Sequence, residues 1–257
     1  MTTVATVRTC SETGLRLLPD AGEQTFRVAK PKYGPLSAPL RSGRSARRRW
    51  GRYDSYGRTL YLASDEETAF AEVLSVFKRR LGAADPVEKD AAALGLTREE
   101  FLEIAAAEWQ ESSCMGIGAV PRQWRTERRM FRVETAGSGT WIDVEHPDSI
   151  AAIEPRVEGV LARHGIRALT TAVLRGDDRI VTTAIALSLR RITVDDGSVP
   201  QGIHFGSKWG GGWCRAVWLP GDEDEWSTDL RSLSGEDILA TDEHLIRASE
   251  RFRVRVF

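Results

Sequence analysis

The chain has 257 residues, of which 41% are apolar and 28% charged, and its formal net charge is −1. Such a composition is typical of a globular protein with enough apolar side chains for a core. A charge this close to balance argues against a protein that coats nucleic acid or a membrane surface. Three cysteines, far apart and without a Cys-x-x-Cys pair, disfavour a disulfide framework or a structural zinc site. With no signal-peptide pattern and no apolar run near the ~18 residues of a membrane span, a cytoplasmic protein is expected.

The first 49 residues contain one predicted strand between two irregular segments. Residues 1–23 show weak periodicity, so we expect a loosely attached lead-in, followed by a short strand over residues 24–29 that carries Arg27. Prolines and glycines then predict a loop over residues 30–49. The loop holds five arginines, Arg41, Arg44, Arg47, Arg48 and Arg49. They fit a solvated basic run or a phosphate-binding flap, and less well a nucleic-acid arm, which would need more stacking aromatics.

A strand followed by a helix comes next. Residues 59–63 alternate with period two and include Tyr61, which predicts a strand. Residues 64–67 read as a capping box, in which the Ser64 hydroxyl accepts from the Glu67 backbone and the Glu67 side chain reaches back. The helix that follows has an apolar stripe at helical spacing, formed by Phe70, Val73, Leu74, Phe77 and Leu81. Glu72 lies at the margin of this stripe, as either a solvated or ion-paired boundary residue or a site carboxylate.

The middle of the chain mixes helices and strands. Helices are expected over residues 89–94 and from residue 97, where Thr97 and Glu100 form a capping box and the apolar face holds Phe101, Ile104, Ala105 and Trp109. Strands are expected over residues 116–120 and 129–133, separated by a polar turn, and over residues 141–145. Two amphipathic helices follow. The first covers residues 149–163 and buries Ile150, Ile153, Val157, Val160 and Leu161; the second covers residues 177–191 and buries Ile180, Val181, Ala184 and Leu187.

The last part of the chain predicts two strands joined by a glycine-rich loop. The strands cover residues 202–205 and 214–219, and the loop over residues 206–212 is either a floppy hairpin or a segment whose backbone amides approach a ligand closely. An acidic turn over residues 222–225, a helix over residues 242–250 and a closing strand over residues 251–257 complete the pattern. Without regular βαβ alternation, this order predicts an α+β fold: a single domain over residues 1–257, with a mainly antiparallel sheet and flanking helices.

Several familiar catalytic motifs are missing from the sequence. The segment around Ser207 lacks the Gly-Lys pair of a P-loop and the Gly-x-Ser-x-Gly of an esterase. The four histidines have no metal-ligand spacing, so no metal is expected. No Gly-x-Gly-x-x-Gly fingerprint supports a Rossmann dinucleotide site.

An ordered set of short blocks resembles the RES-domain family. The blocks are Arg27 in Thr-Phe-Arg-Val, then Gly51-Arg52-Tyr53-Asp54, Leu-Tyr-Leu-Ala around Tyr61, Thr-Ala-Phe-Ala-Glu-Val-Leu ending at Leu74, and Gly-Ile-His-Phe-Gly-Ser ending at Ser207, followed by Cys-Arg-Ala-Val-Trp. The resemblance implies a fold similar to ADP-ribosyltransferases. It implies a toxin of a toxin–antitoxin pair that consumes NAD+ as a substrate, with no separate cofactor. Two departures are extra segments over residues 85–111 and 193–201, and a run of arginines that leaves Arg52 or Arg49 as the family's second arginine, with Arg52 favoured.

The chemistry of NAD+ cleavage assigns roles to the matching residues. Glu72 would hold the ribose hydroxyls and offset the developing positive charge, and Arg27 and Arg52 (or Arg49) would clamp the pyrophosphate. Tyr61 would form an aromatic wall for nicotinamide, and Ser207 would donate a hydrogen bond near the nicotinamide or its ribose. The expected catalytic residues are therefore Glu72, Arg52 and Ser207.

The acceptor of the ADP-ribosyl group is left open by the sequence. Water would make the protein a glycohydrolase, inorganic phosphate a phosphorylase, and a protein side chain an ADP-ribosyltransferase; NAD+ degradation is favoured. A non-enzymatic protein-interaction module and a toxin that cleaves RNA are the rivals. The resemblance also implies a cognate antitoxin of the Xre type, whereas no membrane and no direct nucleic-acid partner is expected.

Overall fold

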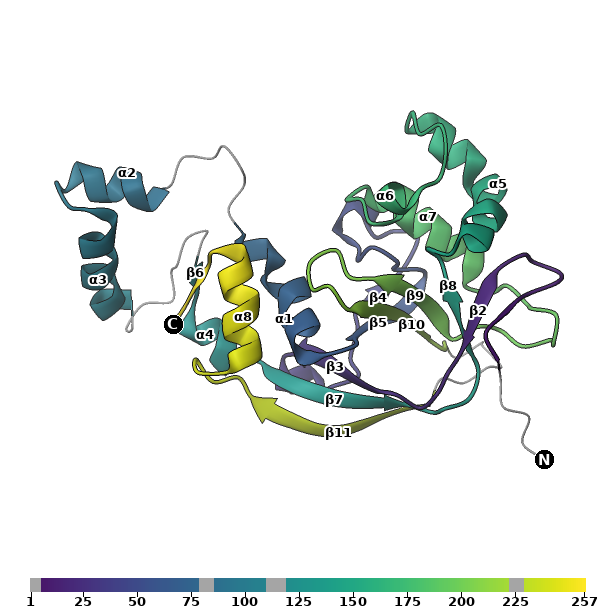
Figure 1. Cartoon of the computed structure of the whole chain (residues 1–257), viewed down its shortest axis with the longest axis horizontal. Helices are drawn as coiled ribbons and strands as arrows, with labels where there is room; N and C mark the ends of the chain where they lie inside the picture. Colours follow the sequence, from purple (N-terminus) through teal and green to yellow (C-terminus); the bar gives the residue numbers. More distant parts are fainter. Residues whose placement is uncertain (1–5, 79–85, 110–118, 222–228) are drawn as a thin grey trace.

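A computed structural model describes residues 6–78, 86–109, 119–221 and 229–257 (Figure 1). The strands are β1 (Arg8–Thr9), β2 (Arg16–Pro19), β3 (Gln24–Ala29), β4 (Leu40–Arg41), β5 (Gly57–Ala63), β6 (Ala119–Val120), β7 (Arg129–Thr135), β8 (Thr140–Asp143), β9 (Gly202–Gly206), β10 (Trp213–Leu219), β11 (Leu230–Asp237) and β12 (Arg255–Val256). The α-helices are α1 (Glu66–Leu74), α2 (Pro86–Ala93), α3 (Arg98–Trp109), α4 (Arg122–Thr126), α5 (Pro147–Arg163), α6 (Thr171–Leu174), α7 (Arg179–Leu189) and α8 (Glu243–Phe252). Short 3₁₀ helices cover Pro31–Tyr33, Arg47–Arg49 and Ser75–Phe77.

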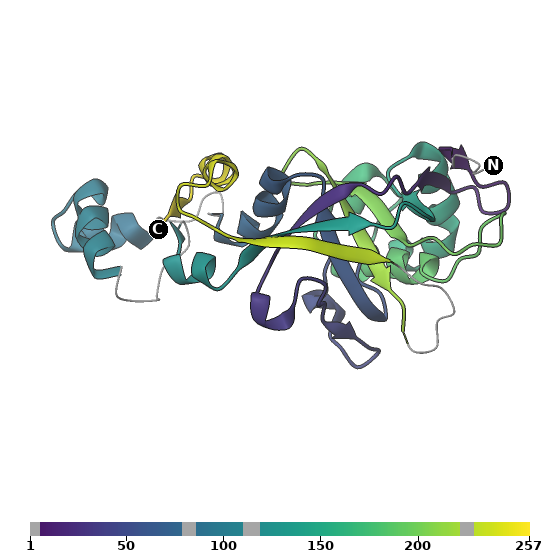
Figure 2. The same cartoon turned by 90° about the horizontal axis from the view of Figure 1, so that it is seen from below.

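One large sheet organises the molecule. Its strand order is β1-β2-β8-β9-β10-β5-β3-β7-β11, with β4 added to β5. All its pairs are antiparallel except β8 with β9, and a separate small sheet pairs β6 with β12 in parallel. Helices α5 and α7 pack together at one end of this sheet, and α1 packs against α8 towards the other end (Figures 1 and 2). The protein is therefore an α+β fold with a mostly antiparallel sheet, as predicted.

The alternation of strand residues divides the core between the two faces of the sheet. On β10, Cys214, Ala216 and Trp218 belong to the larger core that includes residues of α1, α5 and α7. Val217, between them, belongs to a smaller core on the opposite face with Leu60 and Leu62 of β5. Because successive side chains on a strand point to opposite faces, both faces of β5 and β10 are covered.

Strands β3 and β5 separate almost as soon as they meet. Their pairing consists of Phe26 opposite Ala63, whereas β3 pairs with β7 along its whole length and β5 with β10 along six residues. The two strands therefore diverge and leave a wedge in the sheet. Helix α1, which directly follows β5, packs over this wedge because it contacts both strands.

Most predicted elements are confirmed with small changes at their ends. Strands β3, β5, β9 and β10 and helices α2, α3, α5, α7 and α8 occupy the expected segments. The Thr97–Glu100 capping box is present: the Glu100 carboxylate accepts from the Thr97 amide at 2.8 Å, and Thr97 Oγ1 accepts from the Glu100 amide at 3.2 Å. The closing strand is shorter than expected and covers Arg255–Val256.

The prediction of a loosely attached lead-in is wrong for the described residues before residue 24. Strand β2 pairs with β8 in the large sheet, and Leu15 and Leu17 are fully buried in the larger core. Arg8 also pairs with Asp195 and Asp196, which joins the first strand to the extra segment 193–201. The sequence signal was weak because two short strands separated by a turn give too few residues for a visible period.

The predicted cap of α1 is wrong by one residue. Asp65 is the N-cap, and its carboxylate accepts from the Thr68 amide at 2.7 Å. Ser64 donates to Asp65 at 2.5 Å, while Glu67 forms ion pairs with Arg247 and Arg251 of α8 instead of reaching back. An aspartate at the N-cap supplies both the acceptor and a charge that favours the helix N-terminus.

Other differences follow from weak or misleading patterns. The expected polar turn before β7 contains helix α4, and both α6 and β11 were missed, because α6 has only four residues and β11 few apolar ones. Ile104 of α3 was predicted to be buried but is 53% exposed, and Ala184 and Leu187 of α7 are only partly buried whereas Ile185 and Leu189 are fully buried. Leu81, the side chains of Ala105 and Trp109, residues 116–118 and the acidic turn at 222–225 lie outside the described residues.

Candidate active site

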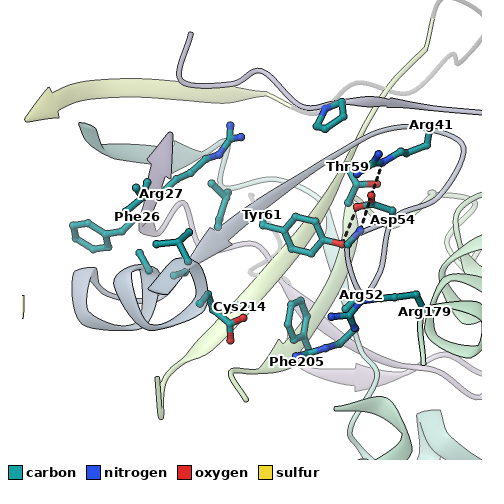
Figure 3. A pocket seen from close by; sticks show the side chains of 18 residues that line it. Phe26, Arg27, Arg41, Arg52, Asp54, Thr59, Tyr61, Arg179, Phe205 and Cys214 are labelled. Atoms are coloured by element: carbon teal, nitrogen blue, oxygen red, sulfur yellow. Dashed lines mark hydrogen bonds and ion pairs between the residues drawn. The ribbon is translucent and has the colours of Figure 1, made fainter. Parts of the chain in front are cut away.

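A pocket of about 400 Å³ opens in the wedge between β3 and β5. It brings together four of the six residues predicted for the site, Arg27, Arg52, Tyr61 and Glu72, and adds others that include Arg179 and Phe205. Figure 3 shows Arg27 and Phe26 at one end of the pocket, Arg52, Arg179 and Phe205 at the other, and Tyr61 between them.

Glu72, which lines the pocket, is in contact with Ser207. Ser207 is separated from Glu72 by 135 residues of sequence, yet its hydroxyl donates a hydrogen bond to Glu72 Oε1 at 2.6 Å. The same hydroxyl oxygen accepts from the Gly210 amide at 2.7 Å and from the Trp209 amide at 3.1 Å. These two donors fix the hydroxyl so that its proton points to Glu72. In this structure the Ser207 hydroxyl donates to a protein carboxylate, and the hydrogen bond to a ligand expected from the sequence stays a prediction.

The glycine-rich loop 207–212 is held tightly against α1. A Cβ atom at Gly210 would lie 2.7 Å from Thr68 Cα, and one at Gly212 would collide with Ser64 and Asp65. Only glycine allows this close approach of two backbones. Arg251 of α8 adds a tether, because it donates to the carbonyl oxygens of Trp209 (3.1 Å) and Gly210 (2.9 Å) and also pairs with Glu67. The interpretation of this loop as a floppy hairpin is therefore wrong.

Arg52 presents unused donors to the other end of the pocket. The side chain is 7% exposed, and its Nε and Nη1 atoms have no hydrogen-bond partner among the described residues. Its guanidinium lies 5.6 Å from the centre of the Phe205 ring, a cation–π contact. Arg179, at the first turn of α7, lines the same end. Buried guanidinium groups normally have all their donors satisfied, so this end of the pocket is suited to an anionic ligand.

A network around Asp54 holds the segment that carries Arg52. The Asp54 carboxylate accepts from Tyr61 Oη (2.9 Å), from Arg41 Nε (2.7 Å) and from the Gly51 amide (2.8 Å). A Cβ at Gly51 would lie 2.5 Å from the Tyr61 hydroxyl, so the turn requires glycine. Burial, with Asp54 second, raises the pKa of Tyr61 well above its usual value, so the phenol stays neutral and its ring forms part of the pocket wall.

Arg27 has a different set of partners. Its Nη1 and Nη2 atoms donate to the carbonyl oxygens of Pro35 (2.5 Å) and Ser37 (2.7 Å) in the loop that follows β3. Figure 3 draws its guanidinium directed away from Cys214. Burial lowers the pKa of Arg27 to about 10, so the side chain is still charged at neutral pH. Arg27 therefore fixes the loop over the pocket, and it lies at the opposite end from Arg52.

Arg49, the alternative to Arg52, is exposed in the 3₁₀ helix Arg47–Arg49 and does not line the pocket. In the same basic loop, Arg41 does line it and Arg44 and Arg48 are exposed. The geometry thus favours Arg52 over Arg49.

Cys214 forms part of the apolar side of the pocket opposite Ala63 on the neighbouring strand. Burial, with the charge of Glu72 second, raises the pKa of its thiol, so it is a neutral, unreactive group. No cluster of three or more His, Cys, Asp or Glu side chains suited to a metal ion occurs in the described ranges.

Sequence reasoning missed the supporting residues of the site. Asp54 and Phe205 stand inside the blocks that carry the family resemblance, so their positions could have suggested a role. Arg179 follows a helix N-cap, Asp178, and no pattern distinguishes it from other basic residues at helix starts. Taken together, the pocket offers the carboxylate of Glu72 in its lining, the aromatic ring of Tyr61, and the cations Arg52 and Arg179 at one end.

Comparison with known proteins gives one match. The family model described as RES domain matches residues 24–129, a segment that includes Arg27, Arg52, Tyr61 and Glu72 but not Ser207. No curated protein and no solved structure matches the chain. Among the described helices, none combines the length and apolar character needed to cross a bilayer.

Proposed function

Because the chain carries a RES domain over residues 24–129, we propose that it is an NAD+-consuming enzyme of the kind found in toxin–antitoxin systems, which cleaves the bond between nicotinamide and ribose. The observation that carries this proposal is the pocket itself. It combines a carboxylate fixed by Ser207 with a buried arginine whose donors are unused.

The proposed reaction needs charge stabilisation more than acid catalysis. The bond between ribose C1′ and the nicotinamide nitrogen breaks, its electron pair goes to the nitrogen, and nicotinamide leaves as a neutral base. Positive charge then develops on the ribose, and Glu72 stabilises it. The fixed orientation of the carboxylate avoids reorganisation during the step.

Recognition of the rest of NAD+ is assigned to the other end of the pocket. Arg52, with Arg179 beside it, would bind the pyrophosphate through charge-assisted hydrogen bonds. Tyr61, which lies between the two ends of the pocket, would provide the aromatic wall for nicotinamide. Arg27 would act indirectly, by holding the loop that closes the pocket. The fold relation to ADP-ribosyltransferases is part of the same proposal.

The acceptor decides which enzyme this is. With water, the new bond to C1′ gives ADP-ribose and a proton; with inorganic phosphate, it gives ADP-ribose 1″-phosphate. We favour these degrading reactions over transfer to a protein. The test is to incubate the purified chain with NAD+, with and without phosphate, and to identify products by mass spectrometry. Stable NAD+ with a well-folded protein would contradict the proposal and favour a non-enzymatic interaction module.

Replacing Glu72 by Gln tests the central role, since it keeps the size and removes the charge. NAD+ turnover is expected to fall by about 100-fold or more, as for other preorganised charges. The matched control is Glu158→Gln on the exposed side of α5, which removes the same charge far from the pocket lining. Turnover of Glu72→Gln within about threefold of the control would argue against the role, because even a modest transition-state interaction exceeds that factor.

ADP-ribosyl transfer to a cellular protein is the second candidate. It is favoured if label from NAD+ appears on protein in an extract while free ADP-ribose does not accumulate. RES-family membership also leads us to expect an Xre-type antitoxin that covers the pocket entrance. A co-expressed neighbouring gene product that blocks NAD+ loss would support that partner.

A further inference from the structure

A second pocket, of about 490 Å³, lies on the other side of the loop that Arg27 holds. It shares Arg27, Val28 and Pro39 with the candidate active site. Its lining includes four cationic side chains, Arg27, Lys30, Arg58 and Arg128, and no aspartate or glutamate.

Two of these cations, Arg58 and Arg128, keep most of their hydrogen-bonding capacity, whereas Arg27 already donates to two carbonyl oxygens. Arg58 Nη1 donates to the Ala38 carbonyl oxygen at 2.5 Å, and Arg128 Nη1 donates to the Trp124 carbonyl oxygen at 3.0 Å. Each guanidinium carries five N–H donors, and no other acceptor for these two side chains occurs among the described residues. Lys30 has one carboxylate partner, Glu127, at 2.5 Å, which lies outside the lining.

Arg58 and Arg128 have no carboxylate partner in the lining of the cavity, so their charges favour the entry of an anion. The carbonyl acceptors of Arg58 and Arg128 hold these two side chains at the pocket without neutralising their charges, whereas Lys30 is paired with the carboxylate of Glu127. Arginine forks match the oxygens of a phosphate group in pairs, and three of the four cations are arginines. Tyr33, which also lines this pocket, is 64% exposed, and the ammonium group of Lys32 lies 4.9 Å from the centre of its ring.

We propose that this second pocket is a binding site for a phosphate group, which the remaining N–H donors of Arg58 and Arg128 would hold. The phosphate could belong to free inorganic phosphate or to a nucleotide that extends over the shared wall from the active site. The binding itself does not depend on whether the neighbouring pocket cleaves NAD+.

The test is to titrate inorganic phosphate into the full chain and to measure the heat of binding by calorimetry. Chloride salt keeps the ionic strength constant during the titration. The double variant Arg58→Gln/Arg128→Gln is expected to bind phosphate about tenfold more weakly or worse, since two charge-assisted contacts are lost. The matched control is Arg156→Gln/Arg163→Gln, which removes two exposed charges from α5. Lys30→Gln serves as a second variant if the arginine pair disturbs folding, as judged by circular dichroism.

Phosphate binding no stronger than chloride binding, or equal weakening in the control pair, would overturn the proposal. The source of the phosphate is found by repeating the titration on Glu72→Gln protein saturated with NAD+. Loss of phosphate binding assigns the pocket to a phosphate of the dinucleotide, and unchanged binding assigns it to a free anion. The titration measures phosphate binding and needs no turnover of NAD+. Its outcome can therefore be interpreted even if the protein does not cleave NAD+.

Discussion

Two arginines at opposite ends of one pocket have opposite relations to the protein around them. Arg27 gives two of its nitrogens to the carbonyl oxygens of Pro35 and Ser37, whereas two nitrogens of Arg52 have no partner among the described residues. Both are largely removed from solvent, so burial alone does not separate them. The difference lies in the donors: Arg27 completes the fold, and Arg52 is left for a ligand.

Of the substitutions that compare the two arginines, Arg52→Gln should give the larger effect on activity, because it removes the charge whose donors at Nε and Nη1 have no partner among the described residues. We expect kcat/KM for NAD+ to fall by about 100-fold while the melting temperature stays close to that of the wild type. Steady-state kinetics and a thermal melt measure the two quantities. Arg49→Gln, three residues earlier and exposed, is the matched control and should keep full activity. If both variants lose activity equally, the contrast between buried and exposed arginines in this loop fails.

Ser207→Ala should have an intermediate effect, since Ser207 acts through Glu72. Loss of the 2.6 Å hydrogen bond frees the carboxylate to reorient, and the amides of Trp209 and Gly210 lose their acceptor. We expect kcat to fall by about tenfold with a small change in KM.

Ser207→Thr keeps the hydroxyl and provides the conservative comparison. Recovery of kcat in this variant would separate positioning from a general packing role. A large rise in KM in Ser207→Ala, with kcat unchanged, would instead indicate direct contact with the substrate, as the sequence predicted.

The strands and the helix that carry the site residues could be predicted from the sequence, whereas the long-range contacts between these residues could not. The strand with Arg27, the strand with Tyr61 and the helix with Glu72 each have a period or a cap that can be read from neighbouring residues. The Ser207–Glu72 contact joins residues 135 positions apart, and the family resemblance rather than any local pattern suggested their proximity.

The hydrogen-bond partners of the site residues could not be predicted from the sequence. Arg27 and Arg52 look alike in the sequence, and only the path of the loop after β3 gives Arg27 its carbonyl partners. The sequence predicted that Ser207 would face the ligand, whereas the amides of Trp209 and Gly210 donate to its oxygen and its hydroxyl donates to Glu72. Long-range packing, which has no local signature, decided these roles.

Arg27→Gln tests the other member of the pair. The loss of two charge-assisted bonds to loop carbonyls should lower the free energy of unfolding by about 1–3 kcal/mol. The effect on NAD+ turnover should be only a few-fold, smaller than for Arg52→Gln. Urea denaturation compared with Arg156→Gln, an exposed charge on α5, measures the stability loss. Unchanged stability with abolished activity would reverse the roles assigned to the two arginines.

The ion pair between Asp195 and Arg8 provides a reference for the two arginines Arg27 and Arg52. Asp195 is far from both in the sequence and does not line the pocket, so we expect this ion pair to stabilise the fold only. The Ser11 backbone amide first, and then Arg8, lower the pKa of Asp195 to about 2. Because its folded pKa lies below its unfolded value, the stability it contributes is present above about pH 4 and is lost as the pH falls towards 2.

Asp195→Asn should therefore be slightly less stable than the wild type at pH 7, with the difference narrowing below pH 4, and NAD+ turnover should be unchanged. Urea midpoints measured from pH 7 to pH 3, with Glu158→Gln as the control, check this; a difference that widens in acid would contradict the assignment.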